Sequence, residues 1–334
     1  MPTSLTESLD NLYTTTWQNM KGEVADQVFD ATPFWFWLRA NDGLESVEGG
    51  KWLSEPLRYA KADVVYVGKG ESLALADKEF LTIAKDDWKY QATNVTRFGI
   101  DDQQNRGKNQ ILSLMNAKLS NSRDSLVDDL ETTLAGLNRV ASPKKFLGLQ
   151  DIIADDPTAA AATLHGILPT AGNDTWWRNQ TKTMAGVSFG TSGVNEMNKL
   201  LNACSNNQRQ DAPDIILSGK HPFELYWQET LEQRQVTNKT LGDAGFQNVE
   251  FRGVPIVWSP AIASADIGVT AGRMYFINSR FVKFKYDPMV FFDMTEWKPI
   301  PAQINDRVAQ IITAGNLMTS RRRVHGVMHT INTV

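Results

Sequence analysis

The chain has 334 residues, of which 42% are hydrophobic, so it is long enough for one large domain or two ordinary ones with a sizeable core. Its 34 basic and 38 acidic residues give a net charge of −4, which argues against a general nucleic-acid-binding module, because affinity for phosphate backbones depends on a basic excess. Its single cysteine, Cys204, excludes an internal disulfide framework and a cysteine-rich zinc site.

The amino-terminal sequence has neither the basic nor the apolar region of a signal peptide, so we expect none. No apolar run approaches the roughly 20 residues of a transmembrane helix, and the longest candidate, at 34–38, is far shorter. We therefore expect synthesis in a reducing cytoplasm and no membrane association.

Residues 1–30 are a polar lead-in with one helical patch of apolar side chains. The patch consists of Leu5, Leu9, Leu12, Trp17, Met20 and Val24. The run PFWFWL at 33–38 follows, and its four aromatic side chains need a surface on which to pack. One interpretation is packing within the same domain, because large aromatic residues are mostly core residues. The other is a clamp onto a neighbouring subunit through Trp35 and Trp37, since exposed aromatic clusters mark interfaces.

A long two-stranded hairpin is predicted at about 47–73, between the turn signals of Gly49-Gly50 and Gly68-Lys69-Gly70. Pro56 indicates that its strand is an edge strand or an isolated ribbon. Its rim is charged, with Lys51, Glu55, Arg58, Lys61, Asp63, Lys69 and Glu71. Because a two-stranded ribbon alone is marginally stable in water, we expect this hairpin to lie on a partner.

Strands are predicted from 79 to 98, and they lead into a long amphipathic helix at 101–138. Apolar side chains recur along this helix in steps of three and four, at Ile111, Met115, Leu119, Leu126, Leu130, Leu134 and Leu137. Such a helix would be roughly 55 Å long. Its single narrow apolar stripe favours a strut that lies across a sheet, with polar faces toward water or a partner. A coiled-coil arm is the alternative, and the irregular charge pairing argues against it.

The connector at 139–186 is rich in Gly, Ala, Pro and Asp, and a connector of this length is usually functional or mobile. Residues 187–270 alternate between helices and strands, with one strand predicted at 251–258. The remainder is β-rich, with strands on both sides of a proline-containing loop at 288–301.

No sequence motif points to catalysis or to a bound cofactor. Phosphate-binding, dinucleotide-binding and zinc-protease motifs are absent, and FGTSG at 189–193 lacks the spacing of a nucleophile elbow. His325 and His329 are four residues apart, but they lie in a β-like stretch without a third metal ligand nearby. No pair of carboxylates stands out as an acid/base set. We therefore expect no enzyme, no cofactor and no metal.

Two features leave other classes of protein open. The basic cluster of Arg321, Arg322 and Arg323 would suit nucleic acid, the carboxylates of a partner, or a solvated patch between subunits. The ten tryptophans would suit a sugar groove, so a Trp-rich carbohydrate-binding or carbohydrate-active protein is the alternative function. Their scatter along the chain favours packing and contact roles instead.

Six short segments, in this order and spacing, resemble a tailed-phage major capsid protein of the Hong Kong 97 type. They are Glu55-Pro56-Leu57-Arg58-Tyr59, Trp88-Lys89, Gln104-Asn105-Arg106-Gly107-Lys108, Thr175-Trp176-Trp177-Arg178-Asn179-Gln180, Phe251-Arg252-Gly253-Val254-Pro255, and the run from Asn316-Leu317 to Gly326-Val327-Met328. The resemblance covers nearly the whole chain, and it implies an α+β fold of that type.

The resemblance also implies a division of the chain into the named parts of such a subunit. These are an N-arm at 1–44, an E-loop hairpin at 45–77, a P-domain at 78–150 with the helix at 101–138 as its spine, a connector at 151–184, an A-domain at 185–275, and C-terminal strands at 276–334 that return to the P-domain, with a loop at 288–301.

The function that the resemblance implies is structural. The subunit would self-assemble into pentamers and hexamers of an icosahedral shell that encloses phage double-stranded DNA without binding it specifically. Further partners would be scaffolding, portal and decoration proteins. Because the chain starts almost directly at the arm, we expect a separate scaffolding protein or none. Some relatives crosslink a hairpin Lys to an Asn of a neighbour, and Lys51, Lys61 and Lys69 are the candidates by region only.

Eleven side chains of the arm, the hairpin and the basic cluster are the predicted assembly contacts. They are Trp35, Trp37, Lys51, Arg58, Lys61, Asp63, Lys69, Glu71, Arg321, Arg322 and Arg323.

Overall fold

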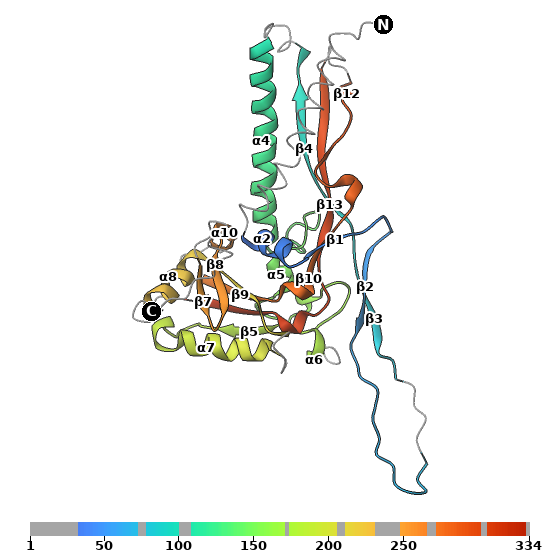
Figure 1. Ribbon diagram of the computed structural model, residues 1–334, viewed down its shortest axis with the longest axis vertical. Helices are drawn as coiled ribbons and strands as arrows, with labels where there is room; N and C mark the ends of the chain where they lie inside the picture. Colours follow the sequence, from blue (N-terminus) through green and yellow to red (C-terminus); the bar gives the residue numbers. More distant parts are fainter. Residues whose placement is uncertain are drawn as a thin grey trace.

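The computed structural model describes residues 33–72, 78–99, 108–170, 174–205, 211–230, 248–265, 272–301 and 306–331. They form two six-stranded sheets, several helices and a two-stranded hairpin that projects from the body of the subunit (Figure 1). Among these residues, no helix combines the length and the apolarity needed to cross a membrane.

The first sheet is organised around one long strand, β13 (Arg307–Thr319). β4 (Lys89–Arg97) pairs antiparallel with it over nine residues, from Arg97 opposite Arg307 to Lys89 opposite Gly315. Shorter strands follow one another along the other side of β13, and β1 lies beyond β10. They are β12 (Lys298–Pro299), β11 (Asp293–Met294), β10 (Val282–Tyr286) and β1 (Leu44–Ser46).

The predicted long helix is α4 (Lys108–Ala135), which runs beside β4 (Figure 1). Its 28 residues make it roughly 42 Å long. The expected stripe is confirmed from Leu119 to Leu134, since Leu119, Leu126, Leu130 and Leu134 are all buried. Residues 101–107 of the predicted helix lie outside the described residues.

The helix ends at Ala135, three residues before the predicted limit of 138. The side-chain amide of Asn138 donates to the carbonyls of Thr133 (2.6 Å) and Phe146 (2.9 Å), which satisfies one of the free carbonyls at the end of the helix. The carboxylate of Asp151 in turn accepts the backbone N–H groups of Asn138 and Gly148. Leu137 therefore lies beyond the helix and is half exposed.

The second sheet has the strand order β5-β14-β9-β6-β8-β7 and a hydrophobic core of its own. Its strands are β5 (Gln180–Thr183), β14 (Gly326–Ile331), β9 (Gly272–Ile277), β6 (Ile215–Ser218), β8 (Val254–Trp258) and β7 (Asn248–Phe251). The helices α7 (Phe189–Cys204) and α8 (Lys220–Thr230) pack against it, and α10 (Pro260–Ala265) contacts α8 and the long helix α4.

Two predictions for this part of the chain are corrected. The strand expected at 251–258 is confirmed only from 254 to 258, as β8, because Arg252 and Gly253 take positive φ angles (53° and 80°) and turn β7 back into β8. The last strand, β14, belongs to the second sheet rather than returning to the first, because the short helix η5 (Arg322–Val324) redirects the chain after β13.

The connector at 139–186 is packed into the body and contains short regular elements. These are α5 (Leu149–Ile152), η1 (Ala160–Ala162), α6 (Asp174–Trp177) and the edge strand β5. Ile152, Leu164 and Trp177 are fully buried. A connector of this length was expected to be functional or mobile. Its described residues instead form a structural segment that fills part of the core.

The aromatic run forms the helix α2 (Pro33–Ala40), and its apolar face lies inside the subunit. Trp35 is fully buried, with its ring edge-on to Phe284 at a centroid distance of 4.7 Å. Trp37 is partly buried against the same core. Packing within the subunit is thus the correct interpretation for Trp35, which is not available as an assembly contact.

Candidate interaction surface

The predicted hairpin exists, but its second strand lies further along the chain than expected. β2 (Leu53–Arg58) pairs with β3 (Leu81–Asp86), from Leu53 opposite Asp86 to Arg58 opposite Leu81. The expected limits of 47–73, and the segment boundary at 77, therefore cut the hairpin before its return strand. The two strands are joined by a long loop at 59–80, of which 73–77 lie outside the described residues.

The base of the hairpin is anchored by an alternating pattern of side chains. Leu53 and Leu57 on β2 and Ala84 on β3 point into the first core and are buried. Leu81 and Ile83, the outward members of β3, are more than half exposed. One face of the ribbon is thus fixed to the body, while the other presents apolar side chains to the surroundings.

A buried lysine ties β2 to the first sheet. Lys285, on β10, is only 5% exposed, and its Nζ lies 3.0 Å from Glu55 Oε2 and 3.4 Å from Glu45 Oε1. Glu45 also pairs with Lys283 at 3.0 Å. Burial raises the pKa of Glu45, but the hydrogen bond from Lys283 and the charge of Lys285 outweigh it, so the pKa lies below its ordinary value. The buried cation of Lys285 is therefore neutralised by Glu45 and by Glu55, the carboxylate that belongs to the hairpin.

A buried histidine ties β3 to the end of β13. His165 Nε2 accepts the backbone N–H of Thr319 (3.2 Å), so the ring proton lies on Nδ1, which donates to Asp86 Oδ2 at 2.9 Å. The carbonyl of His165 accepts the N–H of Lys85 at 3.1 Å. Both strands of the hairpin base are thus held by polar contacts to the body as well as by apolar packing.

Beyond this base the loop leaves the body altogether (Figure 1). The last ladder bond runs from Tyr59 N–H to the carbonyl of Phe80 (3.1 Å). Val64, Val65, Tyr66 and Val67 follow, and all four are exposed, with Tyr66 at 96% and Val64 at 80%. Four consecutive apolar side chains in water are unfavourable for a monomer and mark an interaction surface.

The predicted charged residues at the two ends of the hairpin, excluding Glu55 and Arg58 on β2, divide into two groups. Asp63 and Glu71 shape the loop itself, because Asp63 pairs with Lys78 at 2.7 Å and Glu71 accepts the N–H of Gly68 at 2.8 Å. Lys51, Lys61 and Lys69 are exposed, and Lys51 lies 4.4 Å from the ring centroid of Trp52. All five belong to the predicted contact set, and the three lysines are the exposed members of the five that form no ion pair in the described residues.

The structure brings four of the predicted contact residues together in one groove. Arg58 and Lys61 of the hairpin and Arg321 and Arg323 from the turn after β13 line a hollow of about 650 Å³. Trp176, stacked on Tyr59 at 5.5 Å, and Phe281 are among the other lining residues. These cations are far apart in the sequence, and no pattern in it predicts that they meet.

Arg322 does not belong to this groove. Its side chain points inward and is fully buried. Nε donates to the carbonyl oxygen of Ile152 (2.6 Å), and Nη1 donates to the carbonyl oxygen of Ala162 (2.6 Å). Burial, together with the charge of Arg139, lowers the pKa of Arg322 to about 10, so the group stays charged at neutral pH. Its proposed role as an assembly contact is therefore wrong, because no partner can reach it.

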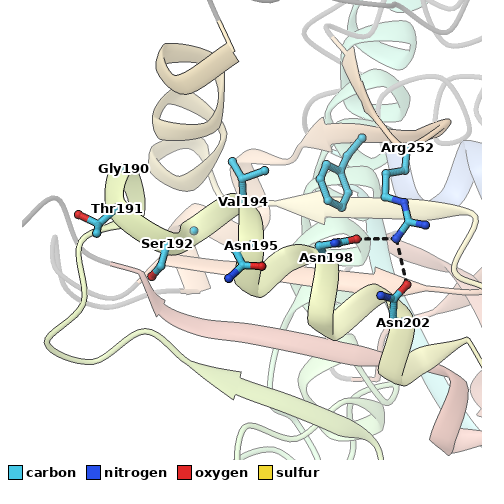
Figure 2. A pocket seen from close by; sticks show the side chains of 10 residues that line it. Gly190, Thr191, Ser192, Val194, Asn195, Asn198, Asn202 and Arg252 are labelled. Atoms are coloured by element: carbon cyan, nitrogen blue, oxygen red, sulfur yellow. Dashed lines mark hydrogen bonds between the residues drawn. The ribbon is translucent and has the colours of Figure 1, made fainter.

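A second hollow, of about 600 Å³, lies along α7 and the β7–β8 turn (Figure 2). Arg252 reaches across to α7 and donates to the side-chain oxygens of Asn198 and Asn202, the latter at 2.9 Å. The remaining lining side chains are small, apolar or amides. The hollow is open and polar, and its described lining carries the hydroxyls of Thr191 and Ser192 but no histidine, lysine or carboxylate.

The titratable groups elsewhere in the described residues do not form a reactive site. No group of three or more His, Cys, Asp or Glu is placed to hold a metal ion in the part of the chain that the structure describes. Burial raises the pKa of the Cys204 thiol far above its ordinary value, which keeps it protonated. His325 is fully buried, with Nδ1 accepting the N–H of Asn278.

Neither a protein-family model nor a curated protein matches this sequence. Solved structures do match. The capsid of cyanophage A-1(L) gives a TM-score of 0.61 at 14% identity, over 89% of this chain and 92% of that one. The capsid of the myovirus XM1 gives 0.55 at 11%, over 87% and 91%. The SrpI encapsulin of Synechococcus elongatus PCC 7942 gives 0.51 at 12%, over 91% and 89%. The chain therefore has the α+β fold of these shell proteins, as the sequence resemblance implied.

Proposed function

We propose that the chain is a structural major capsid protein that assembles into the pentamers and hexamers of an icosahedral shell around phage double-stranded DNA. The observation that carries this proposal is the hairpin, whose base is fixed to the body while its apolar loop has no cover within the described subunit. The exposed loop of one copy would be buried against the body of a neighbouring copy. Repetition of this head-to-tail contact closes into a ring when the rotation from one copy to the next allows it.

The parts of the subunit take the following roles in this proposal. The E-loop is the hairpin from about 47 to 86, extended past the predicted limit so that it includes β3. The P-domain is the first sheet with α4 as its spine, and the A-domain is the second sheet with α7 and α8. Residues 1–44 form the N-arm, and the loop at 288–301 meets other capsomers. The subunit carries out no catalysis and is found in the virion shell.

The carbohydrate-binding alternative gains no support from the structure. Trp35 and Trp177 are fully buried, and Trp176 is stacked on Tyr59 and tilted against Trp177. A sugar groove needs aromatic faces that are open to solvent along one surface. Trp35 and Trp177 are used for packing instead, and the more exposed Trp52 and Trp227 lie apart in the chain, before β2 and on α8.

Deletion of residues 64–70 tests the role of the hairpin. The base is held by Leu53, Lys285 and His165, none of which is removed, so we expect a folded subunit with an unchanged circular dichroism spectrum. We expect that it fails to form particles in velocity sedimentation, because the apolar loop that covers its neighbour is gone. The matched control is Val140→Ser, an exposed apolar residue in the turn after α4.

Normal particles from the deletion variant would show that the hairpin is not an assembly arm. The packaged nucleic acid is tested separately, by extraction from particles purified from infected cells. Double-stranded DNA is expected, and particles that contain only protein would contradict the phage assignment.

A further inference from the structure

The hollow along α7 and the β7–β8 turn offers hydrogen-bond donors without an acidic group beside them (Figure 2). Its polar side chains are one guanidinium, three amides and two hydroxyls. They are Arg252, Asn195, Asn198, Asn202, Thr191 and Ser192. Arg252 is exposed and forms no ion pair with any acid in the described part of the chain. The hollow therefore carries a positive charge that no residue of its lining neutralises.

Arg252 fixes the orientation of two of the amides. A guanidinium can only donate hydrogen bonds, so Asn198 and Asn202 both turn their side-chain oxygens toward it. Their NH2 groups are left as donors. Within the described residues, no hydrogen bond uses these NH2 groups or the side-chain amide of Asn195. The hollow thus suits a ligand that supplies oxygen acceptors.

The donors form a strip along one face of α7. Thr191, Asn195, Asn198 and Asn202 follow one another at intervals of four, three and four residues, which places them on the same side of the helix. From the first to the last of them the helix rises roughly 16 Å, which is the length of about five residues of extended chain. We call these four residues and Arg252 the donor strip. Its length matches an extended peptide, whose backbone carbonyls are regularly spaced acceptors.

The charge of the donor strip favours a peptide over a nucleic acid. Affinity for a phosphate backbone depends on several cations, and the strip has only Arg252. A single carboxylate is enough to pair with this guanidinium through charge-assisted hydrogen bonds. Val194 lines the same hollow and is 39% exposed, so it offers an apolar contact to a neighbouring side chain of the ligand. The lining therefore suits a peptide that combines acidic and apolar residues.

We propose that the donor strip is a docking site for an extended acidic segment of a partner protein. A carboxylate of that segment pairs with Arg252, and its backbone carbonyls accept hydrogen bonds from the amides of Asn195, Asn198 and Asn202. The site goes beyond the proposed assembly role and is independent of it, because its lining includes no residue of the hairpin.

Fluorescence anisotropy with the full-length chain tests this proposal. The probe is a fluorescein-labelled peptide of about eight residues, longer than the strip, in which Glu alternates with Ala. A matched probe has Gln in place of every Glu. We expect saturable binding of the Glu peptide and about tenfold weaker binding of the Gln peptide, which corresponds to about 1.4 kcal/mol. The difference reports the ion pair with Arg252.

Three variants separate the charge from the backbone contacts. Arg252→Asn removes the cation and keeps the turn, because Asn tolerates the positive φ of 53° at this position. It should raise the dissociation constant of the Glu peptide about tenfold and remove the difference between the two peptides. Asn195→Ala should weaken both peptides by the same factor. Lys199→Ala removes an exposed cation of α7 outside the lining, so this matched control should bind like the unmodified chain.

Absence of saturable binding, or equal affinity of the unmodified chain and Arg252→Asn for the Glu peptide, would overturn the proposal. Tighter binding of a short single-stranded oligonucleotide or of inorganic phosphate than of the Glu peptide would also overturn it, because the hollow would then be a phosphate site. Velocity sedimentation of the same preparations reports particle assembly separately. Particles that bind no peptide would therefore leave the proposed function standing, and a chain that binds the peptide without assembling would contradict only the proposed function.

Discussion

Arg321, Arg322 and Arg323 are adjacent in sequence, yet the fold separates their roles. Arg321 reaches the surface and pairs with Asp211, whereas Arg322 points inward and donates to the carbonyls of Ile152 and Ala162. The three arginines were predicted together as assembly contacts, and the structure confirms an exposed position only for Arg321 and not for Arg322. A run of like charges has no periodicity that indicates which member faces the core, and the carbonyl acceptors of Arg322 lie more than 150 residues away.

Replacement of Arg322 with Met should therefore be far more costly than replacement of its neighbour. Two buried carbonyls would lose their donors, and each such loss costs about 1–3 kcal/mol, so we expect the free energy of unfolding to fall by about 3 kcal/mol or more. Arg321→Met removes an ion pair on a partly exposed side chain and should cost less than about 1 kcal/mol. Urea denaturation of the purified subunits measures both, and equal losses would contradict the internal role of Arg322.

His325 predicts a pH dependence of stability. Burial, together with the charge of Arg322, lowers its pKa to about 3, whereas in the unfolded chain it is about 6.5. The unfolded chain therefore binds more protons between these values, and the free energy of unfolding falls as the pH falls from about 6.5 toward 3. His325→Gln cannot titrate, so its stability should decline less steeply over this range. Parallel curves for the two proteins, measured by urea denaturation at several pH values, would contradict this assignment.

At the scale of single elements, the sequence was most informative where structure is local. The steps of three and four predicted α4 and its buried leucines, because helical periodicity depends only on neighbouring residues. The hairpin was located and strands were predicted at 79–98, but the pairing of β3 with β2 was not predicted, because it spans the long loop at 59–80. The anchors His165 and Lys285 were missed for the same reason, since His165 and Asp86 are 79 residues apart.

The hairpin combines a fixed base with an exposed loop. We therefore expect its backbone amides to fall into two classes that differ in the rate of hydrogen exchange. In the isolated subunit, amides within the β2–β3 ladder should be protected, whereas amides at 61–67 should exchange rapidly, because no ladder bond holds them. In assembled particles the amides at 61–67 should become protected as a neighbour covers them. Exchange monitored by mass spectrometry checks this, and a loop that remains unprotected in particles would contradict the assembly role.

At the scale of the whole molecule, the two sheets are joined by chain segments that pass from one to the other. β9 lies in the second sheet and the next strand, β10, lies in the first. Later in the chain, β13 lies in the first sheet and β14 in the second. The general α+β fold was predictable because the order of its elements is visible in the sequence. The sheet to which each strand belongs was not predictable, because the strands of this region have similar β patterns. Their placement depends on pairing with distant strands, such as β4 for β13 and β5 for β14.

Self-assembly of the full-length chain is the central claim, and velocity sedimentation of the chain expressed alone, with electron microscopy of any fast fraction, tests it most directly. We expect closed shells, tubes or rings of five and six subunits, because the exposed hairpin loop finds cover only on another copy. A sharp, stable monomer that also remains monomeric when a scaffolding protein is supplied would contradict the account.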